Sequence, residues 1–154
     1  MIFISHRGNI NGKNPQLENK PSYIQDALNN GYEVEIDIYY DNGWWLGHDN
    51  PQYKIAYNWL INSHKLWLHC KDINTLSKLS RRDGKNIWND NLNYFWHQND
   101  DYTLTNKKFI WTYPGKPLGR YNNSIAVLPE TIPNWNIKNA VGICSDIIEK
   151  FKNE

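Results

Sequence analysis

The sequence predicts an α/β fold: a small, pared-down TIM-type β/α barrel with about seven to eight mostly parallel strands and few helices. Short apolar segments recur along the 154 residues and alternate with helical or loop segments, which favours a parallel sheet. A full eight-fold barrel typically needs about 250 residues, so several connections are expected to be loops. No repeat, low-complexity tract or linker divides the chain, and we expect residues 1–154 to form a single domain.

The elements of the first half follow from the residue pattern. Residues 1–5 form a short apolar run. Residues 21–30 are predicted to be a helix, because the initial proline suits the first turn and Gly31 suits the stop. Residues 33–39 alternate acidic and apolar side chains, which is the two-residue period of a strand. Residues 41–46 begin with Asp-Asn-Gly, a tight turn, and return as the second arm of a hairpin.

The second half is predicted to contain more strands than helices. Residues 65–70 are the next strand candidate, and Asp72 is suited to cap a helix that runs to about Arg82. Further short strand candidates are residues 93–97, 109–113, 124–128 and 140–144.

Composition excludes several classes of partner. The 17 Lys and Arg residues nearly balance the 16 Asp and Glu residues, and no basic run stands out, so neither nucleic acid nor an anionic membrane is expected as a partner. No apolar run approaches the roughly 20 residues of a membrane span. Eight Trp and ten Tyr residues argue against disorder. The sequence leaves the oligomeric state open.

We expect a cytoplasmic protein. Residues 1–4 are apolar, but they lack a basic n-region and meet His6 and Arg7 almost at once, unlike a secretory signal. Cys70 and Cys144 each lie in an apolar strand candidate, which favours reduced, buried thiols over a disulfide.

Polar groups gather where the predicted strands of the first third end. His6 follows the first strand and His48 follows the hairpin. Glu35 and Asp37 lie two apart on the second strand, so their side chains share one face. Because functional groups of β/α barrels collect at the carboxyl ends of the strands, these four side chains are candidates for one site.

Two carboxylates on the inner face of a barrel would repel each other and lose hydration. A cation removes both penalties, and oxygen ligands suit Mg²⁺ or Ca²⁺, so we expect one divalent cation as cofactor. Together with Arg7, the cation would neutralise the phosphoryl oxygens of a small phosphodiester substrate. One histidine would take a proton from the attacking hydroxyl and the other would protonate the leaving oxygen, and the sequence does not assign the two roles.

Four short motifs stand in a fixed order: HRGN from His6, LEN from Leu17, EID from Glu35 and GHD from Gly47. In this order and spacing they resemble the glycerophosphodiester phosphodiesterases, a family of the phosphatidylinositol-phospholipase-C-like barrel superfamily. The likeness is dense over residues 2–50 and sparse afterwards. It implies the barrel fold and metal-dependent cleavage of a glycerophosphodiester.

The resemblance also implies a role for each matched residue. His6 and His48 correspond to the catalytic histidines, Glu35 and Asp37 to metal ligands, and Arg7 to the phosphate-contacting arginine. The further correspondences are Lys71 near the phosphate, Glu18 and Asn19 as a supporting acid–amide pair, Asp49 in the His-Asp pair, and residues 142–146 as the closing strand.

Two positions depart from the family pattern. Lys20 stands where the family has Thr. His69 stands where the family has its third metal carboxylate, and imidazole is a poorer ligand than carboxylate for Mg²⁺ or Ca²⁺. Three alternatives stay open: His69 binds the metal in an altered site, another oxygen such as that of Glu18 or Glu130 takes its place, or activity is weakened.

The aromatic and histidine residues of the later strands have more than one interpretation. Trp96, Trp111 and Tyr113 could stack on a polyol or sugar ring, or fill the core of a thin barrel. For His97, packing, hydrogen-bond support of the site and metal ligation are all open. His64 lies in a polar segment and has no expected role.

The sequence therefore favours an enzyme, a metal-dependent phosphodiesterase acting on a glycerophosphodiester-like or polyol or sugar phosphodiester. The alternative is a catalytically weakened barrel that binds a phosphorylated sugar or lipid headgroup. Both histidines favour the enzyme, and His69 favours the alternative. A third option, lyase-type cyclisation as in the related sphingomyelinase D-type toxins, is disfavoured by the expected reduced cysteines.

Overall fold

The structure is a computed structural model that describes residues 1–81 and 91–153. The described chain forms an α/β fold with one mixed, ten-stranded sheet and four α-helices. The strands are β1 (Ile2–His6), β2 (Glu33–Tyr40), β3 (Trp44–Leu46), β4 (Tyr53–Ile55), β5 (Leu66–Cys70), β6 (Asn93–Trp96), β7 (Tyr102–Leu104), β8 (Ile110–Thr112), β9 (Ser124–Val127) and β10 (Ala140–Ser145). The helices are α1 (Pro21–Asn29), α2 (Tyr57–Ile61), α3 (Ile73–Ser80), α4 (Ile148–Asn153) and the 3₁₀ turn η2 (Pro129–Thr131).

The centre of the sheet is parallel. Its strands follow the order β6-β5-β2-β1-β10-β9-β8, so the first and last strands of the chain, β1 and β10, lie side by side. Antiparallel strands are added at two places: β3 and β4 beside the far half of β2, and β7 beside β8. The carboxyl ends of the parallel strands therefore meet at one end of the molecule, as the sequence predicts.

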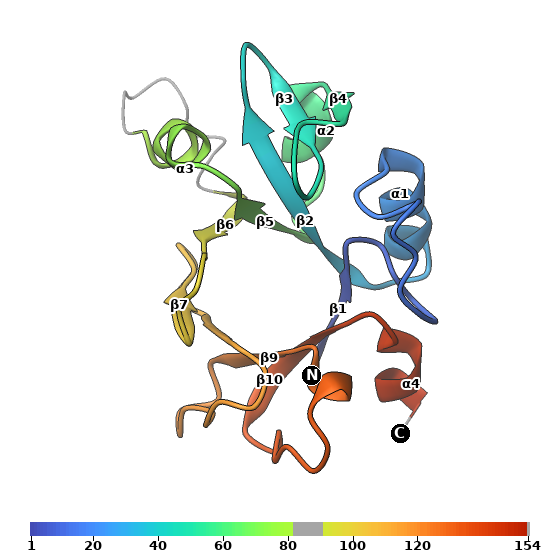
Figure 1. Ribbon diagram of the computed structural model, residues 1–154, viewed down its shortest axis with the longest axis vertical. Helices are drawn as coiled ribbons and strands as arrows, with labels where there is room; N and C mark the ends of the chain where they lie inside the picture. The colour runs from blue at the N-terminus through green and yellow to red at the C-terminus, as the bar shows by residue number, and fades with distance from the viewer. Residues whose placement is uncertain (82–90, 154) are drawn as a thin grey trace.

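The sheet curls until β6 and β7 approach each other (Figure 1), but no strand ladder joins them in the described residues. Asn106 fills the junction. Its backbone N–H donates to Tyr94 O (3.0 Å), its Oδ1 accepts from Tyr94 N (2.8 Å), and its Nδ2 donates to Leu92 O (2.9 Å). The α/β class is thus confirmed, whereas the described chain forms an open, curled sheet without a closed barrel ladder.

Strand alternation divides the core into two main layers. On the outer face, residues such as Ile36, Ile38 and Leu68 pack beneath helices α1, α2 and α3. On the inner face, Ile4, Trp67, Phe95, Trp111, Ile125, Val127 and Cys144 form an inner cluster. The rings of Phe95 and Trp111 contact at 4.6 Å between centroids. This inner cluster fills the interior below the carboxyl ends of the strands.

Most predicted elements are confirmed to within two residues: the helix at 21–30, the hairpin at 41–46, and the strands at 1–5, 33–39, 65–70, 93–97, 109–113, 124–128 and 140–144. Asp72 caps α3 as predicted, accepting a hydrogen bond from Thr75 N, and α3 ends at Ser80; the predicted end near Arg82 lies outside the described residues. The described elements that the sequence pattern did not indicate are β4, α2, β7, α4 and the 3₁₀ turn η2.

The longest helix described, α1, has nine residues, well short of the roughly 20 that cross a bilayer.

The Asn106 junction makes a testable prediction for stability. Asn106→Ala removes two side-chain hydrogen bonds, one to Tyr94 of β6 and one to Leu92 just before it, so the free energy of unfolding should fall by about 1–2 kcal/mol in urea denaturation. The control is Asn123→Ala, which removes a single long hydrogen bond to Lys108 O (3.5 Å) and should cost less than about 0.5 kcal/mol. Equal effects of the two substitutions would show that Asn106 does not join the ends of the sheet.

Candidate active site

A cleft of about 500 Å³ opens inside the curl of the sheet, at the carboxyl ends of the parallel strands. One wall is polar and is formed by His6, Arg7, Glu35, His69 and Lys71, with Asp146 beside His6. The facing wall is mostly apolar and includes Trp111, Tyr113, Pro114, Val127 and Leu128. The cleft therefore offers charged groups on one side and an apolar surface on the other.

The backbone after β1 turns sharply to place Arg7. Arg7 has a left-handed φ of 54°, and Asn19, which contacts it, has a φ of 61°. Arg7 N donates to Glu35 O (2.9 Å), and Asn19 N donates to Arg7 O (3.1 Å), so the strained turn is held from both sides. Such conformations persist only where neighbouring contacts fix them, and here they direct the guanidinium toward Asp37.

Glu35, Asp37 and His69 form a compact group that could hold a metal ion, since one donor atom of each lies within 4.8 Å of the others. His69 Nδ1 lies 3.2 Å from Asp37 Oδ1 and 3.6 Å from Glu35 Oε1. Only 2 % of Glu35 and none of Asp37 is exposed. Glu35 Oε2 is buried and accepts no hydrogen bond from the described residues, so it is free to act as a ligand atom.

Positive groups surround Asp37. Arg7 Nε lies 2.8 Å from Oδ2, Lys71 Nζ lies 3.1 Å from Oδ1, and Asn19 Nδ2 donates to Oδ2 (2.8 Å). Burial alone would raise the pKa of Asp37, but the hydrogen bond with His69 and the charges of Arg7 and Lys71 outweigh it and hold that pKa well below its usual range. Asp37 is therefore ionised at neutral pH.

The same group sets the charge of His69. Burial alone would lower the pKa of His69, but hydrogen bonds with Asp37 and Glu35, together with their negative charges, raise it to about 9. Without a metal, imidazolium is the form that Asp37 and Glu35 favour. With a metal bound, His69 would be neutral and its Nδ1 lone pair would be a ligand. His69 can therefore offer either a positive charge, when protonated, or a ligand atom, when neutral.

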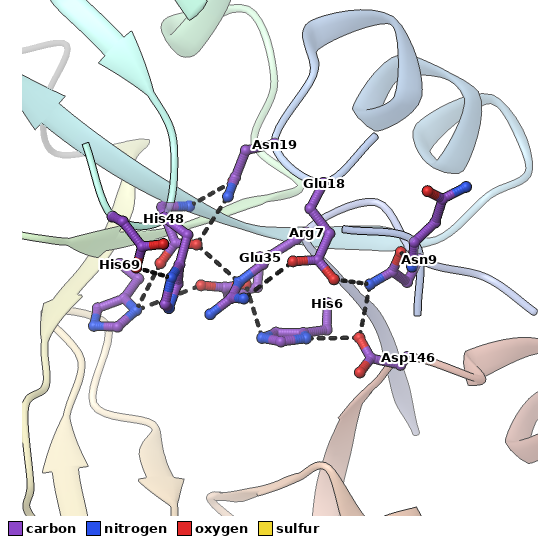
Figure 2. A network of polar contacts seen from close by, with 12 residues as sticks. His6, Arg7, Asn9, Glu18, Asn19, Glu35, His48, His69 and Asp146 are labelled. Carbon is purple, nitrogen blue, oxygen red and sulfur yellow. Dashed lines mark hydrogen bonds and ion pairs between the residues drawn. The ribbon is translucent and has the colours of Figure 1, made fainter. Parts of the chain in front are cut away.

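His6 belongs to a second network across the first and last strands (Figure 2). Its Nδ1 lies 2.7 Å from Asp146 Oδ1, which also accepts from Asn9 Nδ2 (2.8 Å). Its Nε2 lies 3.8 Å from Glu35 Oε2 and faces the cleft. Burial lowers the pKa of His6, but the Asp146 hydrogen bond and the Glu35 charge outweigh it, and the net pKa is raised. An imidazole whose Nδ1 is hydrogen-bonded to a carboxylate can accept or donate a proton at Nε2.

Glu18 and Glu130, the two alternative oxygen ligands, are engaged elsewhere. Glu18 Oε2 accepts from Arg7 (3.1 Å), and Glu18 Oε1 accepts from Asn9 (3.0 Å), as Figure 2 shows. Glu130 Oε1 accepts from Asp146 N (2.8 Å) at the end of β10. Both carboxylates therefore stabilise the loops that carry the site. Glu130 Oε2 has no hydrogen-bond partner in the described residues, but Glu130 is not among the residues that line the cleft. The third donor in the group that could hold a metal ion is His69.

His48 lies on the rim of the same cleft, on the loop after β3. Its side chain is 45 % exposed, and its Nδ1 lies 2.6 Å from Asp49 Oδ1. Gly47, with a φ of 152°, permits this loop, since a Cβ there would lie 2.1 Å from Asn50 O. His48 thus repeats the His–Asp pairing of His6, in a more exposed position.

The structure separates the aromatic candidates. Trp111, Tyr113 and His97 line the cleft. Trp96 does not, because it lies between Phe95 and His97 on a strand and therefore packs on the outer face, against the cluster that contains Ile36 and Ile38. Trp111 is also part of the inner cluster, so it both fills the core and contributes to the apolar wall.

The sequence motifs did not assign a role to Asn9, Lys13 or the Asp146 carboxylate. The β1–β10 register pairs Ser5 with Ser145, and this places Asp146 beside His6. A strand that ends in Ser-Asp next to one that ends in Ser-His could have indicated the pair, but only once β1 and β10 were known to be neighbours. Asn9 follows the HRG motif directly and supports both Glu18 and Asp146.

Comparison of the chain with protein-family models, curated proteins and solved structures finds no match.

The cations around Asp37 predict a strong stability effect in the metal-free protein. Asp37→Asn leaves Arg7, Lys71 and His69 without their shared counter-charge and should lower the free energy of unfolding by about 3 kcal/mol, measured in urea with a chelator present. Asp101→Asn breaks an ion pair of similar length with Lys116 (2.9 Å), but at an exposed site, and should lower the free energy of unfolding far less. If Asp37→Asn is as mild as Asp101→Asn, the carboxylate does not organise the cluster.

Proposed function

We propose that the chain is a metal-dependent phosphodiesterase that cleaves a glycerophosphodiester-like or polyol or sugar phosphodiester, with His6 and His48 as general acid and base. The observation that carries the proposal is the convergence on one cleft wall of His6, backed by Asp146, with the buried group of Glu35, Asp37 and His69. The motif order from His6 to His48, which resembles the glycerophosphodiester phosphodiesterases, supports the same reaction class.

The residues fit a divalent cation. Glu35 Oε2 is a buried carboxylate oxygen that accepts no hydrogen bond from the described part of the chain, and Asp37 shares its face of β2. Their oxygen atoms are ligands that suit Mg²⁺ or Ca²⁺, and the third ligand position belongs to His69. When bound, the cation would supply positive charge to the phosphoryl oxygens.

The chain's own residues carry the rest of the chemistry. Arg7 and Lys71 line the cleft and would neutralise non-bridging phosphate oxygens. One imidazole takes the proton from the attacking hydroxyl, and the other donates a proton to the leaving oxygen as the P–O bond breaks. Asp146 and Asp49 hold the Nδ1 atoms of His6 and His48, which leaves each Nε2 for proton transfer.

The attacking group is a neighbouring hydroxyl of the substrate or a water molecule. Attack by the neighbouring hydroxyl gives a cyclic phosphate, which water then opens. The apolar wall with Trp111, Tyr113 and Leu128 suits the carbon face of a polyol or sugar. The overall fold fits this proposal as a pared-down TIM-type barrel in which loops replace several helices and Asn106 replaces the last strand ladder.

One observation favours a second function, a barrel without turnover that binds a phosphorylated sugar or lipid headgroup. Arg7, Lys71 and His69 already neutralise Asp37 without a metal ion, so these side chains could bind a phosphate directly. The exposure of His48 fits this function too, because an imidazole that is not held in one orientation catalyses proton transfer less effectively.

Turnover of glycerophosphocholine and of bis-(p-nitrophenyl) phosphate, with added divalent metal and with chelator, tests the proposal. His6→Ala and His48→Ala should each lower kcat/KM by at least about 100-fold, because each removes a proton-transfer group. His64→Ala is the matched control, since His64 lies outside the cleft and should leave kcat/KM unchanged.

The outcomes separate the two functions. A chelator-sensitive activity that both cleft histidines control supports the enzyme. No metal-dependent product from either substrate, combined with binding of glycerophosphate that His6→Ala preserves, supports the binding function and overturns the enzyme.

A further inference from the structure

The orientation of the His69 ring decides which nitrogen faces the carboxylates. His69 Nε2 lies 3.0 Å from the carbonyl oxygen of His97 and donates its hydrogen there. The ring also stacks on Phe95, with 5.1 Å between centroids and 7° between planes. The hydrogen bond and the stacking fix the ring, so Nδ1 is the atom directed at Asp37 and Glu35.

The three donors stand on adjacent parallel strands in a fixed register. Asp37 on β2 is the register partner of His69 on β5, and Glu35 lies two residues before Asp37 on the same face. Donors on neighbouring strands keep their spacing better than donors on loops. The strand register and the hydrogen bond to His97 O hold the imidazole nitrogen beside Glu35 and Asp37, whereas Glu18 and one carboxylate oxygen of Glu130 have other partners.

A mixed nitrogen and oxygen donor set discriminates among divalent ions. Mg²⁺ and Ca²⁺ prefer oxygen ligands, and Mg²⁺ releases its water reluctantly. Imidazole binds Fe²⁺, Co²⁺, Ni²⁺ and Zn²⁺ well. A cation must also compete with Lys71 Nζ, which lies 3.1 Å from Asp37 Oδ1, and this competition disfavours weakly bound ions.

We propose that the Glu35, Asp37 and His69 group selects a first-row transition-metal dication over Mg²⁺ and Ca²⁺, with His69 Nδ1 as a direct ligand. The inference deepens the proposed function, since it rests on the same site, but it requires no turnover. Two carboxylates alone would favour Mg²⁺ or Ca²⁺. A ligand set that includes imidazole favours a transition metal instead.

Cobalt(II) binding to the metal-free full-length chain is the test, because its visible ligand-field absorption reports the ligands directly. Calorimetric titrations should give a Kd for Co²⁺ at least about 100-fold below that for Mg²⁺ or Ca²⁺. His69→Glu supplies a third carboxylate in place of imidazole, and should weaken Co²⁺ binding relative to Mg²⁺ by at least about 10-fold and change the absorption spectrum. His69→Gln is a second variant that removes the imidazole without adding charge.

His64→Ala is the control for the Co²⁺ spectrum. His64 does not line the cleft, so the spectrum should persist in this variant. Near-ultraviolet circular dichroism establishes that each variant is folded. Binding of Mg²⁺ or Ca²⁺ as tight as that of Co²⁺, or a Co²⁺ spectrum that both folded His69 variants retain, overturns the inference.

These outcomes are distinct from those of the proposed function. Tight Co²⁺ binding that depends on His69, without cleavage of any phosphodiester, leaves the metal inference standing and removes the enzyme. Turnover supported by Mg²⁺ together with tighter Mg²⁺ binding leaves the enzyme standing and removes the inference.

Discussion

The buried carboxylate of Asp37 is the group on which the rest of the polar site depends. A fully buried charge is tolerated only with compensating partners, and Asp37 obtains three of them from two separate segments of the chain. The strained turn brings Arg7, the strand β5 brings His69, and Lys71 follows directly behind it. The same compensation gathers Arg7, His69 and Lys71 at the cleft wall, where the proposed function would use positive groups to bind a phosphate.

The alternation of side chains along the strands places the polar site above an apolar interior. Side chains that point inward from the lower part of the strands, such as Trp67, Phe95 and Trp111, pack together and exclude water. Inward side chains nearer the carboxyl ends, such as His6, Glu35 and His69, are polar and border the cleft. Electrostatic interactions in the cleft are strengthened because the floor beneath them is apolar.

The sequence predicts those features that depend on local pattern. The shared face of Glu35 and Asp37 follows from their two-residue spacing on one strand, and the α/β class follows from the alternation of elements. Features that depend on pairing between distant strands could not be predicted. The contact of His6 with Asp146 requires the β1–β10 register across nearly the whole chain, and the role of Asn106 requires the curl of the sheet. Trp96 lies on the outer face because successive side chains of a strand point to opposite faces, and its neighbour Phe95 points inward.

The location of the cation is the claim on which the functional account rests, and anomalous X-ray diffraction tests it most directly. Crystals of the full chain soaked in Co²⁺, with data collected on both sides of the cobalt absorption edge, should show one strong anomalous peak in contact with Glu35, Asp37 and His69 Nδ1. A peak elsewhere on the protein, with none between these three side chains, would contradict the account.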